Sequence, residues 1–146
     1  MMRVLTTIAL CVTTLCGCTT AGRSCVAEIR GGVWDGAVVA EMANSDTTGL
    51  YDMRIALRHN GLAEGESIGM TVRTVTPDSL WVEEPLTICV ADDGRSRPAQ
   101  HEASVIYRRR VRLSREGIYR ITVTPDREVR GVTAVGVELM PSRGEE

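Results

Sequence analysis

Hydrophobic and polar residues alternate with a period of two along most of the chain, which is the spacing of strands with one buried face. In the clearest run, residues 51–58, one side carries only apolar or aromatic side chains, namely Tyr51, Met53, Ile55 and Leu57. The same pattern predicts strands at 25–29, 37–42, 68–73, 105–113, 118–123 and 132–139. Residues 80–90 are also apolar but contain Pro85, so they are predicted to form two pieces or an edge strand.

Turn dipeptides such as Asp35-Gly36 and Asn60-Gly61 separate these runs, and no long segment has the 3.6-residue period of a helix. Short strands that alternate with turn signals are typical of two packed sheets. We therefore expect an all-β fold, an antiparallel β-sandwich of about eight strands with an Ig-like or jelly-roll-like architecture.

The N-terminal segment has a different pattern. Arg3 precedes an uncharged, mainly apolar run from Val4 to Leu15, which is too short to span a bilayer and is typical of a secretory signal. The run ends in Leu15-Cys16-Gly17-Cys18, and this Leu-x-Gly-Cys sequence resembles the lipobox of bacterial lipoproteins. The resemblance implies cleavage before Cys18 and attachment of lipid to its sulfur. The alternatives are a signal peptide cut without lipidation, or a buried apolar strand.

With 146 residues, the chain has room for one domain after such a signal. We expect a lipoprotein signal peptide at 1–17 and a short tether of small and polar residues at 18–24. The β-sandwich domain is predicted at 25–141, and a disordered tail at 142–146.

The chain has five cysteines, of which only Cys25 and Cys89 lie outside the signal and the lipidation site. In an oxidising compartment these two could form a disulfide, which would stabilise the domain by about 4 kcal/mol on the chain-entropy model. The alternative is two buried thiols on separate strands. No spacing of Cys and His residues suggests zinc.

Composition gives little support for nucleic-acid binding, because the net charge is −2 at pH 7. All 17 basic residues are arginine, and the chain contains no phenylalanine. The two tryptophans, Trp34 and Trp81, are therefore predicted to be core residues, although exposed binding rings are the alternative.

Candidate catalytic residues are few. The only histidines, His59 and His101, are placed at loop edges, where solvated side chains are expected. A base and nucleophile formed by His101 with Ser104 would be accidental, since no Gly-x-Ser-x-Gly or HExxH motif is present. We expect no enzyme activity, no cofactor and no small-molecule substrate.

Two further charged segments have alternative interpretations. Asp92-Asp93-Gly94 and Asp46-Thr47-Thr48 could offer carboxylates to calcium, but plain turns are the expected use and no metal site is predicted. Arg108-Arg109-Arg110 with Arg112 could bind phosphate, but on a strand Arg108, Arg110 and Arg112 would form a solvated face. Arg109 would then fall on the apolar face and extend its charge to the sheet end.

The order of several short motifs resembles that of the gliding-motility lipoprotein family GldH of Bacteroidetes. The likeness covers nearly all of the chain after Cys18. Its motifs are Gly31–Trp34, Tyr51–Asn60, Thr76–Asp78 with Leu80, Pro85–Leu86 before Asp93–Gly94, Tyr107 with Arg110, Gly117–Ile121 and Val135–Val137.

The resemblance implies a non-catalytic accessory or scaffold lipoprotein of the machinery for gliding motility and the linked type IX secretion route. Its expected partners are the membrane, through the lipid on Cys18, and envelope proteins. In that phylum an acidic run after the lipidated cysteine marks export to the outer face. No such run follows Cys18, which favours a domain that faces the periplasm. The alternative function is a carbohydrate- or surface-binding sandwich, which would need a row of exposed aromatic rings.

Overall fold

The computed structural model describes residues 23–61, 65–91 and 101–144. The signal segment and Cys18 therefore lie outside the described residues. Ten strands and one short 3₁₀ helix follow one another in the described parts. They are β1 (Arg23–Glu28), η1 (Arg30–Gly32), β2 (Val33–Trp34), β3 (Val38–Asn44), β4 (Leu50–His59), β5 (Ser67–Val75), β6 (Trp81–Cys89), β7 (His101–Arg112), β8 (Gly117–Pro125), β9 (Val129–Arg130) and β10 (Val132–Pro141).

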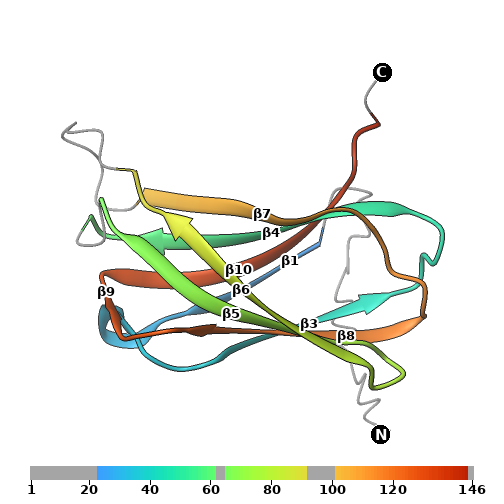
Figure 1. The fold of residues 1–146 in the computed structure, drawn as a ribbon, viewed down its shortest axis with the longest axis horizontal. Coiled ribbons are helices and arrows are strands. Elements are labelled where there is room, and N and C mark those ends of the chain that lie inside the picture. The colour runs from blue at the N-terminus through green and yellow to red at the C-terminus, as the bar shows by residue number, and fades with distance from the viewer. Residues whose placement is uncertain (1–22, 62–64, 92–100, 145–146) are drawn as a thin grey trace, which may run out of the picture.

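The eight long strands form two antiparallel sheets of four strands each, which confirms the predicted β-sandwich (Figure 1). One sheet, here the β4 sheet, has the strand order β1-β10-β4-β7. The other, the β5 sheet, has the order β3-β8-β5-β6. The short strands β2 and β9 pair separately. Within the described residues, no helix is long and apolar enough to cross a bilayer.

The core forms where the alternating apolar side chains of the two sheets meet. The β4 sheet contributes Ile55, Leu57, Val135, Val137 and Leu139, all with an exposed fraction of 0%. The β5 sheet contributes Met70, Val72, Ile121 and Val123, which are equally buried. Because the chain has no phenylalanine, aliphatic side chains, methionines, Trp34 and Tyr119 fill this space.

Two expectations about boundaries need correction. Strand β1 begins at Arg23, so the domain starts two residues earlier than the expected position 25 and includes the last two residues assigned to the tether. At the other end of the chain, the Ser142 amide donates a 2.8 Å hydrogen bond to the Leu50 carbonyl, which extends the pairing beyond residue 141. Residues 80–90 contain one strand, β6, and its position at the edge of the β5 sheet confirms the edge-strand interpretation of Pro85.

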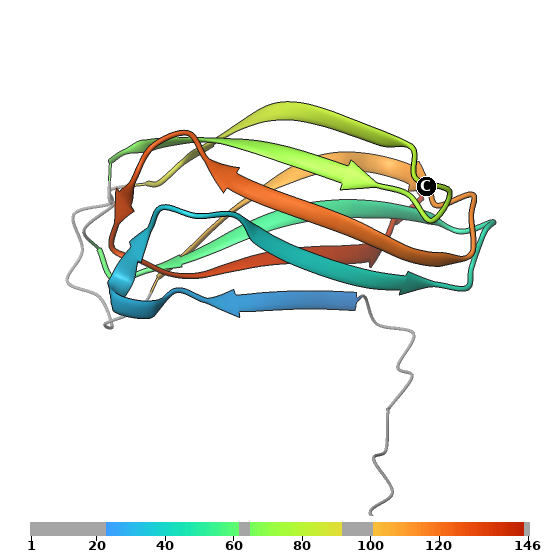
Figure 2. The same ribbon diagram turned by 90° about the horizontal axis from the view of Figure 1, so that it is seen from below.

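Several connections gather at one end of the sandwich, which we call the Arg23 end because β1 starts there. Figure 2 shows that the β3–β4 connection, the β5–β6 hairpin and the β7–β8 turn lie at this same end. The opposite end carries η1 and the paired strands β2 and β9.

The two tryptophans differ in position. Trp34 is 1% exposed and belongs to the core, as predicted. Trp81 is 61% exposed, so its prediction as a core residue was wrong. It begins the edge strand β6 and is opposite Val75 of β5. The Arg73 guanidinium covers its ring at 4.5 Å from the ring centroid.

Candidate functional site

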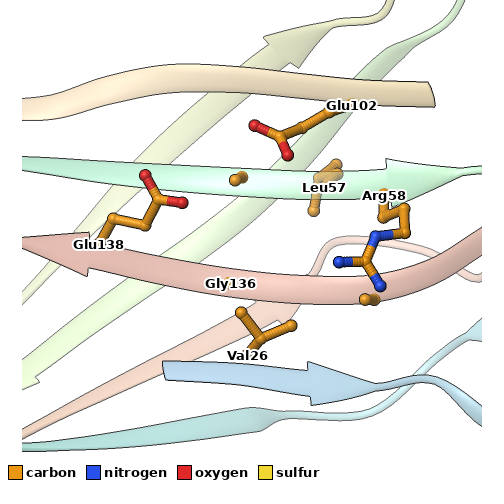
Figure 3. Close-up of a pocket in the computed structure, with 8 residues that line it drawn as sticks. Val26, Leu57, Arg58, Glu102, Gly136 and Glu138 are labelled. Carbon is orange, nitrogen blue, oxygen red and sulfur yellow. The ribbon is translucent and has the colours of Figure 1, made fainter. Parts of the chain in front are cut away.

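The outer face of the β4 sheet contains a shallow hollow between charged side chains (Figure 3). Four strands contribute to it, and its lining residues are Val26, Ala56, Leu57, Arg58, Glu102, Ala134, Gly136 and Glu138. Small residues form its floor: Ala56 of β4 is opposite Gly136 of β10, and Ala134 lies two residues before Gly136 on the same face. Gly136 also allows β1 to lie close, since a Cβ there would be 3.3 Å from the Val26 Cγ2 atom.

Charged groups surround this floor. The Arg54 Nε donates a 2.6 Å hydrogen bond to Glu138, and Arg58 pairs with Glu28 at 3.4 Å. Figure 3 shows the Glu102 and Glu138 carboxylates directed toward the same space from β7 and β10. The hollow is small, about 80 Å³, whereas sites for drug-sized ligands have volumes of about 300–1,000 Å³. The hollow is therefore too small to enclose a drug-sized ligand.

A second hollow lies between the sheets at the Arg23 end, where β6 faces β7. Its volume is about 180 Å³ and its lining is mainly apolar, with Met53, Val82, Val111, Leu113 and Tyr119 among the contributing residues. Beside it, the Tyr107 hydroxyl donates a 2.6 Å hydrogen bond to Glu84, which also pairs with Arg108.

This polar cluster satisfies its own charges. The Tyr107 hydroxyl and, to a lesser extent, the Arg108 charge lower the pKa of Glu84. Burial raises the pKa of Tyr107, and its hydrogen bond to the Glu84 carboxylate raises it further. The cluster joins β6 to β7 across the gap between the two sheets.

The two histidines do not occupy solvated loop edges as expected. His59 and His101 are opposite each other on β4 and β7, and their rings stack with centroids 5.3 Å apart. His59 is 3% exposed, and its Nδ1 accepts a hydrogen bond from the Gly61 amide at 3.3 Å. The expectation failed because the sheet register joins residues that are far apart in the sequence.

The arginine run also differs from its prediction. Strand β7 contains two register irregularities opposite Tyr51, Met53 and Arg54, and Arg110 has a positive φ of 52°. Extra residues in β7 interrupt the alternation of sides. As a result Arg109 is exposed rather than on the apolar face, whereas Arg108 lies against Glu84 of β6.

The possible disulfide between Cys25 and Cys89 is absent, because both are free thiols in the structure. Cys25 packs against the core from β1, whereas Cys89 is exposed at the end of β6. Strands β1 and β6 are edge strands of different sheets, and β1 lies against β3 while β6 lies against β7. A bridge would therefore have to cross the sandwich diagonally.

Of the two calcium candidates, the structure describes Asp46-Thr47-Thr48. Asp92 and Asp93 lie outside the described residues. In the parts of the chain that the structure describes, no three His, Cys, Asp or Glu side chains gather to hold a metal ion. Asp46 instead organises its own loop: it accepts hydrogen bonds from the Thr48 and Gly49 amides, both at 2.9 Å, and from the Tyr51 hydroxyl at 2.8 Å.

This loop predicts a specific pH dependence. The Thr48 amide, followed by the Gly49 amide and the Tyr51 hydroxyl, holds the pKa of Asp46 well below its usual range. A carboxyl with a lowered folded-state pKa stabilises the fold above its unfolded pKa, about 3.9, and loses that contribution as the pH falls further. In urea titrations between pH 5 and pH 2.5, an Asp46→Asn variant should therefore lose less stability than the wild type.

Asp35→Asn is the control for this prediction, since Asp35 is exposed and none of the described side-chain hydrogen bonds involves its carboxylate. Its stability should follow the wild type over the same pH range. An Asp46→Asn variant that loses as much stability as the wild type would contradict the role given to the loop.

The sequence interpretation missed both hollows. A signal for the first was present, since Ala56 and Gly136 are small residues at outward positions of strands whose neighbouring outward positions carry charges. The second had no local signal, because β5, β6 and β7 meet there only through the fold. A scan against protein-family models and a search of curated proteins found no match for this chain.

Proposed function

We propose that this chain is a lipid-anchored, non-catalytic binding or scaffold component of a bacterial cell envelope, with its sandwich facing the periplasm. The observation that carries the proposal is the position of Cys18. It ends a lipobox-like sequence and lies only five residues, 23 minus 18, before the first residue of the sandwich. Five extended residues span at most about 18 Å, so the lipid would hold the domain close to the membrane.

The anchor binds because each methylene group of an acyl chain that enters the bilayer adds to the free energy of membrane binding. One acyl chain gives only marginal, reversible binding, with an association constant of about 10⁴ M⁻¹, whereas two chains give stable anchoring. Bacterial lipoproteins carry two or three chains. The sandwich itself then needs no further contact to stay at the membrane, and its sheet faces are left for protein partners.

The outer face of the β4 sheet is the partner surface that the geometry supports best. It combines an apolar floor with the carboxylates of Glu102 and Glu138 on its rim. The resemblance of the motif order to that of the GldH family supports a partner within the machinery for gliding and type IX secretion. A carbohydrate-binding role has weaker support. All five Trp and Tyr side chains lie in the described residues, and Trp81 alone among them is more than half exposed.

Lipid labelling tests the anchor. Cells that express the full chain are grown with radiolabelled palmitate, and Cys18→Ala is expected to abolish the label and leave an uncleaved precursor. Cys16→Ala is the matched control, because it removes a neighbouring thiol but keeps the Leu-x-Gly-Cys pattern. That variant should be labelled as strongly as the wild type.

An unlabelled wild-type chain that fractionates as a soluble product would refute the anchor. Label that disappears with Cys16→Ala would move the attachment site to Cys16. Crosslinking in the same envelopes, followed by capture of the labelled chain, tests the partners: gliding or secretion components should be recovered with the wild type.

A further inference from the structure

Apolar side chains gather at the Arg23 end. Within the described residues, six large hydrophobic side chains are exposed, and four of them are at this end. Leu80 is 65% exposed and Trp81 61% exposed in the β5–β6 hairpin, and Ile118 is 54% exposed at the start of β8. Val82, the fourth, is 42% exposed beside the inter-sheet hollow.

Leu80, Trp81 and Ile118 form one patch because the hairpin and β8 lie close together, whereas Val82 points from β6 toward the inter-sheet hollow. In the sheet register Val75 is opposite both Trp81 of β6 and Arg120 of β8. Gly117 permits the approach at the tip: it has a φ of 123°, and a Cβ there would be 2.9 Å from the Pro77 Cβ. Ile118 follows directly and therefore lies beside the hairpin tip.

The hairpin tip is held firmly, so exposing its apolar residues to a partner has little ordering cost. The Thr76 amide donates to the Leu80 carbonyl at 2.8 Å, and the Ser79 amide donates to the Thr76 carbonyl at 3.0 Å. Arg115 of the β7–β8 turn pairs with Asp78 at 3.3 Å and joins the tip to the neighbouring turn.

Arginines lie at the same end of the sandwich as the patch. Arg73 covers the Trp81 ring. The exposed residues Arg109, Arg110 and Arg112 belong to the last part of β7, where Arg112 is opposite Leu50 at the start of β4. Three acidic groups here are already engaged: Asp46 within its loop, Asp78 with Arg115, and Asp52, which accepts a hydrogen bond from the Arg110 amide at 2.9 Å. Asp78 is itself exposed, and Glu83 and Glu116 are further exposed acids at this end.

Tryptophan and arginine beside exposed aliphatic side chains are the residues that proteins place at the membrane interface. Tryptophan rings lie at headgroup depth, and arginine is attracted to anionic lipid. Cys18 precedes β1 by five residues, and β1 begins at this same end (Figure 2). A lipid on Cys18 would thus bring the patch, rather than the opposite end, to the bilayer.

We propose that the Arg23 end is a second membrane contact, in which Leu80 and Trp81 enter the headgroup region of an anionic bilayer while Arg109 and Arg110 bind lipid phosphates. This deepens the proposed function and rests on it for the nearness of the membrane. The contact orients the sandwich: its strands run away from the membrane, and β2 and β9 lie at the far end. In this orientation the outer face of the β4 sheet does not face the membrane and is accessible to a protein partner.

Tryptophan fluorescence tests the contact directly, because Trp34 is buried and Trp81 is exposed. The full protein is purified from the membrane fraction with any lipid modification intact. It is then reconstituted into anionic vesicles whose lipids carry bromine on the upper acyl carbons. Trp81 emission should be strongly quenched, whereas a Trp81→Tyr variant, which reports only Trp34, should show no quenching.

A charge variant tests the arginines. Each basic side chain near an anionic surface strengthens binding about fivefold. The double substitution Arg109→Gln with Arg110→Gln should therefore lower the ratio of domains in contact with the bilayer to domains held only by the lipid, by about 25-fold. Arg127→Gln with Arg130→Gln is the matched control. It removes the same charge from the opposite end and should leave the quenching of Trp81 nearly unchanged.

Mass analysis of Cys18 on the same samples separates this inference from the anchor. Lipid on Cys18 without quenching of Trp81 would overturn the membrane contact and leave the proposed function intact. Quenching without lipid would refute the anchor and support the contact. Trp81 that is shielded from aqueous acrylamide but unquenched by bromine would indicate a protein partner on the patch, which also overturns the proposal.

Discussion

Replacing Trp34 with alanine should lower the free energy of unfolding by about 3–5 kcal/mol, the range for deletion of a large buried side chain. Trp34 is 1% exposed, packs in the core and donates a hydrogen bond from Nε1 to the Gly36 carbonyl at 2.9 Å. Its loss would leave a cavity in the core, and the neighbouring side chains could fill it only in part. Urea denaturation followed by circular dichroism measures the change without depending on tryptophan emission.

The chain contains its own control, since Trp81→Ala removes the same side chain from the surface. Its cost should stay below about 1 kcal/mol, because the ring is 61% exposed and loses mainly its contact with Arg73. Equal destabilisation by the two substitutions would contradict the placement of Trp34 in the core and of Trp81 outside it.

Replacing Asn44 with aspartate should cost about 2–3 kcal/mol at pH 7, although the two side chains have nearly the same size. Asn44 is 4% exposed, and its Nδ2 donates to the carbonyls of Leu113 and Arg115, both at 3.0 Å. Its Oδ1 accepts a hydrogen bond from Arg23 at 3.2 Å. An aspartate keeps the acceptor for Arg23 but cannot donate, so two carbonyls lose their partner beside a new negative charge.

Glu41→Gln is the matched control for this substitution, because it lies on the same strand but in the exposed pair with Arg120. An exposed ion pair contributes little, so the change should stay within about 1 kcal/mol. Urea titration compares the two variants. A loss for Asn44→Asp as small as that for Glu41→Gln would show that Asn44 does not join β3 to the β7–β8 turn energetically.

The strands themselves could be predicted from the sequence because alternation of apolar and polar residues is a local property. Each of the eight long strands overlaps a predicted run. The short strands β2 and β9 were missed because two residues cannot show a period. The strand order could not be predicted, since pairs such as β1 with β10 join residues more than a hundred positions apart.

The site residues were harder to predict for the same reason. His59 and His101 are separate loop residues in the sequence pattern, and only the β4–β7 register places them opposite each other. Trp81 was predicted to be core because composition, with no phenylalanine, favours burial of every large ring. Its position two residues after the hairpin tip, on an edge strand, determines its exposure instead.

Pro85 has a consequence for how copies of this domain behave at high concentration. It interrupts the middle of β6, an outermost strand whose free side would otherwise offer a continuous row of amides to a second molecule. A neighbouring copy cannot extend the sheet past that point, so crowding on a surface should not lead to fibre growth through β6.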